Sequence, residues 1–250
     1  MIHPIRYYGD PILRRRASEV KRFDADLARL AGEMIETMYL ADGVGLAAPQ
    51  IGLGIRLFVA LETVEDDDWR EEDWGEDDDW QGEDEEEARL KQVSEAEEEW
   101  DSEGGAAAQP EAKGSGGDGG GLSVADKRST WGARREHVVV NPSIIWREGV
   151  QYGRDGCLSI PGMAAEQVPR SLKVRLRYQD LAGQWQELSA EGYFAHVLQH
   201  EFDHLEGVLY FDRLPEAERR RFLEEHRTAL AELQRDAKER AKSSKPSRVG

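Results

Sequence analysis

Residues 199–204 read QHEFDH and contain the motif His-Glu-x-x-His between His200 and His204. On a helix, side chains at positions i and i+4 lie on one face, so both imidazoles can bind one metal ion. Glu201 would lie at the edge of that face, within reach of a water molecule on the metal. The surrounding pattern predicts a helix from about Glu191 to Leu205. Because the chain has only six histidines, a chance match in a polar helix is the weaker interpretation.

A third metal ligand is needed, because catalytic sites usually have three protein ligands and one open position. The candidates are Cys157, Glu206 and a more distant carboxylate. Cys157 is the only cysteine of the chain and lies in GCLSIPG (156–162), a turn flanked by glycine and proline. A lone cysteine is more often a small core residue, but this turn would present the thiol. The sequence therefore predicts a site with two histidines, one cysteine and one open position.

Helix and strand patterns surround these motifs. Asp24 to Leu40 combines an N-cap residue type with apolar residues at helical spacing. Ile55 to Leu61 alternates as a strand, and Leu172–Asp180 with Gln184–Leu188 predicts a hairpin. Pro215 begins a charged C-terminal helix. These elements predict an α+β fold with mostly antiparallel strands around a central helix that carries His-Glu-x-x-His.

The formal net charge of −18 comes from one segment of the 250-residue chain. Residues 65–103 hold 22 acidic and three basic residues, which leaves 29 acidic and 30 basic residues elsewhere. Residues 104–121, which follow, are rich in glycine, alanine and serine. Such a composition cannot bury enough apolar surface to offset the entropy of ordering. We predict a single domain over residues 1–250, interrupted at 64–135 by an acidic, tryptophan- and glycine-containing, disordered insertion.

Composition also argues against several classes of protein. The chain has no run of about eighteen apolar residues, and residues 1–10 (MIHPIRYYGD) lack the pattern of a signal peptide. Neither the balanced body nor the acidic insertion has the basic stripe that nucleic-acid binding requires. A single cysteine fits a reducing compartment. We therefore expect a cytoplasmic protein that binds neither membranes nor, directly, nucleic acid.

Three motifs occur in a characteristic order: GVGLAAPQ at 43–50, GCLS at 156–159 and QHEFDH at 199–204. With them the sequence resembles the peptide deformylases across nearly all of the chain outside the insertion. The opening YGDPIL (8–13) and the C-terminal helix resemble the bacterial form. The resemblance implies a hydrolase that removes the N-formyl group from the N-terminal methionine of newly made proteins and releases formate. It also implies one divalent metal, ferrous iron in the cell, with zinc, nickel or cobalt as alternatives.

The resemblance assigns roles to individual residues. It implies three metal ligands, which are Cys157, His200 and His204. Glu201 would act as general base and then as general acid. The Gln50 amide and the Leu158 backbone N–H would stabilise the oxyanion.

A methionine side chain needs an apolar pocket near the metal. The candidate pocket residues are Gly43, Val44, Gly45, Tyr193, His196 and Val197. Gly43 and Gly45 would let the backbone approach an extended peptide, whereas the other residue types are more often ordinary core. His196 lies four residues before His200, where it could bind the metal or titrate, although packing at the pocket rim is the simpler interpretation.

One position departs from the family pattern. Asp155 stands before Gly156 where the family usually has glutamate. Because aspartate is one methylene shorter, we expect it to fall short of its partner, for which Arg170 is a candidate by charge. Retained activity with a changed metal affinity would follow.

Two other functional hypotheses remain open. A zinc peptidase also has His-Glu-x-x-His, with a third ligand downstream of His204, and it would keep its metal after Cys157→Ala. A binding module would instead work through the acidic segment, and deleting 64–135 would abolish its role. The simplest interpretation of that segment is a solvated, self-repelling loop; a basic partner anchored by tryptophans and transient association with the ribosome are sharper hypotheses.

Overall fold

The computed structural model describes residues 1–63, 123–130 and 133–243, which belong to one compact unit. Most of the expected insertion lies outside these residues, so its disorder stays a prediction. The helices and 3-10 turns are η1 (Pro11–Arg14), α1 (Ala25–Leu40), η2 (Ala48–Ile51), α3 (Val124–Thr130), α4 (Gly192–Glu206), η4 (Tyr210–Arg213), α5 (Glu216–Glu225) and α6 (Arg227–Ser243). The strands are β1 (Gly45–Ala47), β2 (Leu57–Thr63), β3 (Ala133–Glu148), β4 (Gln151–Cys157), β5 (Ile160–Arg170), β6 (Lys173–Gln179) and β7 (Trp185–Glu191).

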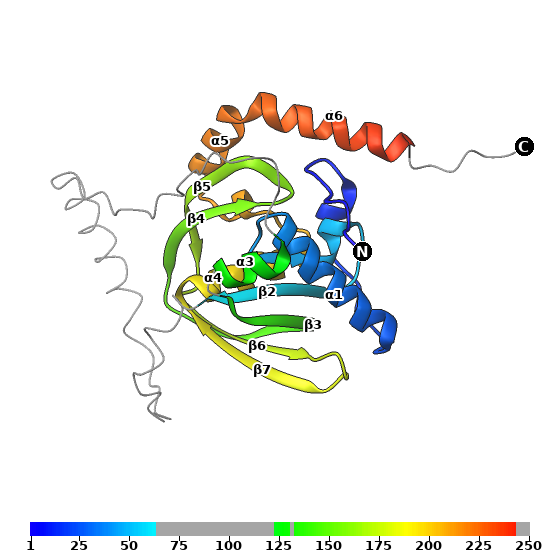
Figure 1. Ribbon diagram of the computed structural model, residues 1–250. Coiled ribbons are helices and arrows are strands. Elements are labelled where there is room, and N and C mark those ends of the chain that lie inside the picture. The colour runs from blue at the N-terminus through cyan, green and yellow to red at the C-terminus, as the bar shows by residue number, and fades with distance from the viewer. Residues whose placement is uncertain (64–122, 131–132, 244–250) are drawn as a thin grey trace, which may run out of the picture. The chain divides into compact units, whose positions relative to one another are not determined.

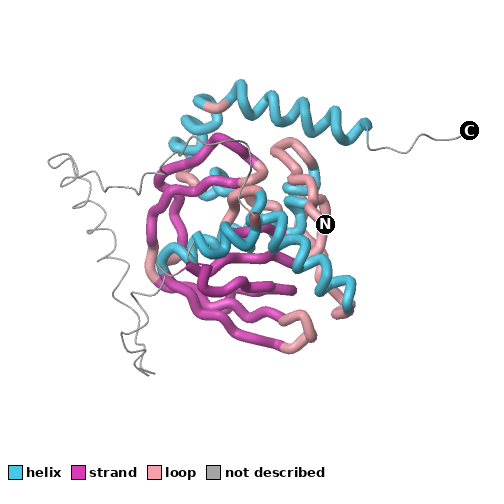
Figure 2. The backbone as a smooth tube through the Cα atoms, in the orientation of Figure 1, coloured by secondary structure: helices cyan, strands magenta, loops and turns pink. Residues whose placement is uncertain are grey.

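The strands form a five-stranded sheet and a separate hairpin (Figures 1 and 2). The sheet has the order β1-β2-β3-β6-β7, so β1 is an edge strand, and β4 pairs with β5. Every one of these pairings is antiparallel. Together with the helices, this arrangement confirms the predicted α+β fold.

The sheet is buried on both faces near β2. Leu57, Val59 and Leu61 belong to the apolar cluster that contains α1, whereas Phe58 and Ala60 belong to the cluster that contains α4. This division follows from the period of two along a strand. A third cluster joins β5 to η4, α5 and α6, so the C-terminal helices pack on the hairpin (Figure 1). α4 is therefore the central helix, and it carries His200 and His204 as predicted.

Two predicted helices lie close to their expected positions. The Asp24 carboxylate accepts a hydrogen bond from the Leu27 N–H at 3.1 Å, which caps α1. α4 begins at Gly192 and ends at Glu206, one residue later at each end than predicted. The strand expected from Ile55 begins at Leu57, because Ile55 instead pairs with Ser18 in an isolated parallel bridge.

The end of the expected insertion is ordered, which corrects its boundary at residue 135. Residues 124–130 form α3, and β3 already begins at Ala133, where it pairs with Thr63 of β2. The C-terminal helix also differs from the expectation, because it is divided at His226 into α5 and α6. The His226 ring packs against Phe222, four residues earlier, with ring centroids 4.5 Å apart, and no glycine or proline marks this break in the sequence.

Candidate metal centre

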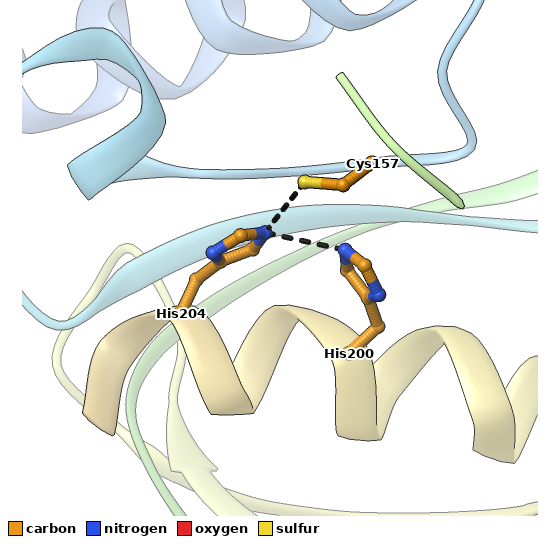
Figure 3. Close-up of side chains that lie close together, drawn as sticks. All are labelled: Cys157, His200 and His204. Atoms are coloured by element: carbon orange, nitrogen blue, oxygen red, sulfur yellow. Dashed lines mark hydrogen bonds between the residues drawn. The ribbon is translucent and has the colours of Figure 1, made fainter. Parts of the chain in front are cut away.

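Three side chains from two distant parts of the chain converge above α4 (Figure 3). Cys157 lies at the end of β4, and its Sγ is 3.2 Å from His204 Nε2. That nitrogen is also 3.2 Å from His200 Nε2. The alternative third ligand, Glu206, is engaged elsewhere, because it pairs with Arg56 at 2.6 Å and with Arg16 at 2.9 Å.

The chemistry and spacing of these three groups fit one divalent metal. Ligands about 2.0–2.3 Å from a tetrahedral metal lie roughly 3.3–3.7 Å apart, close to the separations seen here. Asp155 Oδ1 lies 2.7 Å from His200 Nδ1, which leaves Nε2 facing the cluster. Both histidines are buried, and nitrogen and thiolate ligands suit zinc, iron, nickel or cobalt.

Asp155 does reach its partner, so the predicted shortfall is wrong. Arg170 extends to it and donates from Nη2 at 2.8 Å and from Nε at 3.1 Å. The Asp155 carboxylate also lies 3.0 Å from His196 Nε2 and contacts His200. Burial alone would raise the pKa of Asp155, but the adjacent His200, His196 and Arg170 outweigh it and hold that pKa well below its usual range.

Glu201 is buried directly behind β1. A Cβ at Gly45 would lie only 2.3 Å from Glu201 Oε1, so glycine leaves the room that the carboxyl group occupies. Glu201 Oε2 makes no hydrogen bond to any described residue. Burial raises the pKa of Glu201 to about 7, which suits a group that takes and returns protons near neutral pH.

The Gln50 amide is oriented toward the cluster. Its Oε1 accepts a hydrogen bond from the Ala47 N–H at 2.7 Å. Its Nε2 therefore faces Ser159 Oγ at 3.4 Å and Cys157 Sγ at 3.5 Å. Gln50 is 1% exposed, so this orientation is fixed by the protein.

A cavity of about 870 Å³ opens beside these groups. Its lining includes every predicted site residue except His204: Gly43, Val44, Gly45, Gln50, Cys157, Leu158, Tyr193, His196, Val197, His200 and Glu201. Tyr193 is half-exposed, and its ring stacks on His196 at a centroid distance of 6.5 Å. His196 is therefore a wall residue in contact with Asp155 and is not part of the three-ligand cluster.

Sequence reasoning missed the support of this site by Asp203. Asp203 is buried inside the QHEFDH motif and accepts hydrogen bonds from Arg170 Nη1 at 2.9 Å and from Arg213 Nε at 3.0 Å. Arg170 thus joins Asp203 on α4 to Asp155 on β4. A carboxylate within the apolar pattern of a helix needs a cation if it is buried, and this was the available signal. Asp42 and Arg154 also line the cavity and were not singled out.

Comparisons with known proteins point to one family. The family model for polypeptide deformylase matches residues 2–104 and 119–220. The chain is 40% identical to the peptide deformylase of Thermus thermophilus over 238 residues, which cover 95% of each chain. It is 34% identical to that of Acidobacterium capsulatum over 214 residues, 86% of this chain and 87% of the relative.

Solved structures show the same likeness. The crystal structure of peptide deformylase from Thermus thermophilus matches with a TM-score of 0.65 and 38% identity, over 94% of this chain and 99% of that one. The structure from Thermotoga maritima matches with a TM-score of 0.56 and 30% identity, over 86% of this chain and 99% of that one. The chain therefore belongs to the peptide deformylase family.

Proposed function

We propose that this peptide deformylase is a metal-dependent hydrolase that removes the N-formyl group from the N-terminal methionine of newly made proteins and releases formate. The observation that carries the proposal is the convergence of Cys157, His200 and His204 beside the buried Glu201. Ferrous iron is the metal we expect in the cell, with zinc, nickel or cobalt able to occupy the same ligands.

The metal would supply Lewis acidity, which activates a water molecule and polarises the formyl carbonyl. Glu201 takes the proton of the attacking water and then gives it to the leaving amine. The Gln50 Nε2 group, already aimed at the cluster, donates a hydrogen bond to the developing oxyanion together with the Leu158 backbone N–H. The products are formate and a free N-terminus.

The substrate would bind along the cavity as an extended peptide. β1 is an edge strand, and Gly43 and Gly45 carry no side chain to hold the peptide backbone away. Val44 and Val197 would form the apolar wall of the pocket for the methionine side chain. Tyr193 and His196 would lie at one side of that pocket. Since this cavity adjoins the metal ligands, a formyl group at the peptide's N-terminus would lie next to them.

Formate release from a formyl-Met peptide, measured with protein prepared without oxygen and with metal analysis of the same sample, tests the proposal. We expect turnover that requires about one metal per chain. Absence of turnover with every divalent metal tried would refute it. Cleavage of internal peptide bonds without formate release would favour the zinc peptidase.

The setting of the reaction stays a prediction. Among the described residues, none of the helices has the length and apolar character needed to cross a membrane. We propose a cytoplasmic location, nascent chains as substrates and transient contact with the ribosome. The role and partner of the acidic segment lie outside the described residues.

A further inference from the structure

α3 packs against α1 and β3, in a stretch where the sequence predicted a disordered insertion (Figure 1). Its Lys127 is 8% exposed, although lysine is rarely buried without partners. The Lys127 ammonium donates to the Tyr39 carbonyl at 2.9 Å and to Asp42 Oδ1 at 2.5 Å. Both acceptors belong to the turn that ends α1.

That turn has a demanding geometry. Asp42 has a φ of 57°, in the left-handed region that few non-glycine residues adopt. The Gly43 N–H donates to the Met38 carbonyl at 3.0 Å, and the Asp42 N–H donates to the Tyr39 carbonyl at 3.2 Å. The Tyr39 carbonyl thus lies at the negative end of the α1 dipole, where a buried ammonium is favourable.

The turn leads directly into the substrate-facing strand. Asp42 and Gly43 line the cavity, and β1 begins at Gly45. The turn packs closely at this point, because a Cβ at Gly43 would lie only 2.7 Å from Leu158 Cδ1. A shift of the turn would therefore move the backbone along which the peptide lies.

We propose that Lys127 is a substrate-positioning residue: it clamps the Tyr39–Gly43 turn and so sets the affinity of the cavity for the formyl-peptide. The proposal rests on the deformylase function above. Lys127 does not contact the reacting atoms, and its effect passes through Asp42 and the start of β1. In this role α3 has a function, although composition alone assigned its residues to a disordered insertion.

Steady-state kinetics with a formyl-Met peptide test the clamp. Lys127→Met keeps the apolar stem but removes the charge, and Asp42→Asn removes the ion pair with a residue that tolerates positive φ. We expect each to raise KM by about tenfold with kcat within about twofold, because uniform binding is lost. Combining both substitutions should add little, and Lys127→Arg should restore most of the affinity.

Arg128→Met is the matched control on the same helix. Arg128 pairs with Glu136 at 2.6 Å and lies over the Tyr39 ring, so it contacts the turn at a side chain but contacts neither acceptor of the Lys127 ammonium. We expect this control to lower the thermal midpoint with KM unchanged. A KM for Lys127→Met within about twofold of wild type, or an equal rise in Arg128→Met, would overturn the assignment.

If Lys127→Met does not fold, the KM of Asp42→Asn decides the test, because the Asp42 carboxylate is 71% exposed and its replacement should leave the protein folded. Failure of the wild type to release formate would instead refute the proposed function.

Discussion

Replacing Gly45 with alanine should displace Glu201, the proposed general base, without unfolding the protein. The new Cβ would lie 2.3 Å from Glu201 Oε1 and 2.7 Å from its Cδ, whereas ordinary contacts begin at 3.4 Å. The carboxyl group must therefore retreat by about 1 Å. Gly45 is not among the glycines with positive φ, so alanine fits the backbone.

The magnitude follows from the burial of Glu201. Glu201 is 3% exposed, so its carboxyl group cannot move into solvent. The displacement must therefore change the position of the carboxyl group relative to the metal-binding cluster. Misplacement by about 1 Å can cost about a hundredfold in rate. We expect kcat/KM for formate release to fall by about that factor, with metal content and thermal midpoint near those of the wild type.

Two variants make this reasoning refutable. Gly54→Ala is the matched control, since the Cβ that alanine adds would have no heavy atom of a non-neighbouring residue within 4 Å, and it should keep full activity. In a Glu201→Gln background, Gly45→Ala should cost less than about threefold, because the group on which it acts is already lost. Full activity of Gly45→Ala, or an equal loss in both backgrounds, would show that the alanine does not act through Glu201.

Three further outcomes are expected. Cys157→Ala should lose the metal, measured per chain by elemental analysis, because two imidazoles alone remain; retention of one metal would favour a peptidase-type site. Asp155→Glu should keep formate release but change the metal dissociation constant, since its contacts to His200 and Arg170 must rearrange; an unchanged constant would contradict this. In metal-free protein, burial raises the pKa of Glu201 from 4.5 to about 7, so the folded state holds a proton that the unfolded state releases between those values. The stability of the wild type relative to Glu201→Gln should thus be greatest below pH 4.5 and fall by about 3 kcal/mol as the pH rises through 7. Urea unfolding at about pH 5 and about pH 8 measures this difference, and equal values at both would contradict it.

The elements that the sequence predicted well are those with local signals. α1 has an N-cap and a regular apolar face within one segment, and α4 has a long apolar pattern interrupted only by the metal-site motif. α3 has a local cap, in which the Asp126 N–H donates to Ser123 Oγ at 3.2 Å and the Ser123 N–H donates to the Asp126 carboxylate at 3.1 Å. Seven residues, five of them polar, nevertheless make a marginal helix in isolation. Its order therefore also depends on Lys127 and Arg128, whose partners lie on α1 and β3. Such long-range pairs are not visible in composition, which is why the predicted insertion extended too far.

The candidate site was predictable to the same degree. Three short motifs predicted the residues that the fold brings together, which are the Cys157, His200 and His204 cluster and the buried Glu201 beside it. The contact between Asp155 and Arg170 could not be predicted, because whether a side chain reaches its partner depends on where the fold places that partner. Arg170 supplies the missing reach from β5, at the far end of the hairpin from Cys157.

Metal binding and tertiary packing are coupled in this arrangement. His200 and His204 belong to one helix, but Cys157 arrives on a hairpin that must dock against it. One buried docking contact is Arg170, which lies between Asp155 on the hairpin and Asp203 inside the helical motif, with 2% of its side chain exposed. Removing one partner of such a buried network leaves an unpaired charge and costs about 3–5 kcal/mol. The free energy of metal binding therefore acts on the same hairpin-to-helix contact that the arginine holds, so loss of either should weaken the other.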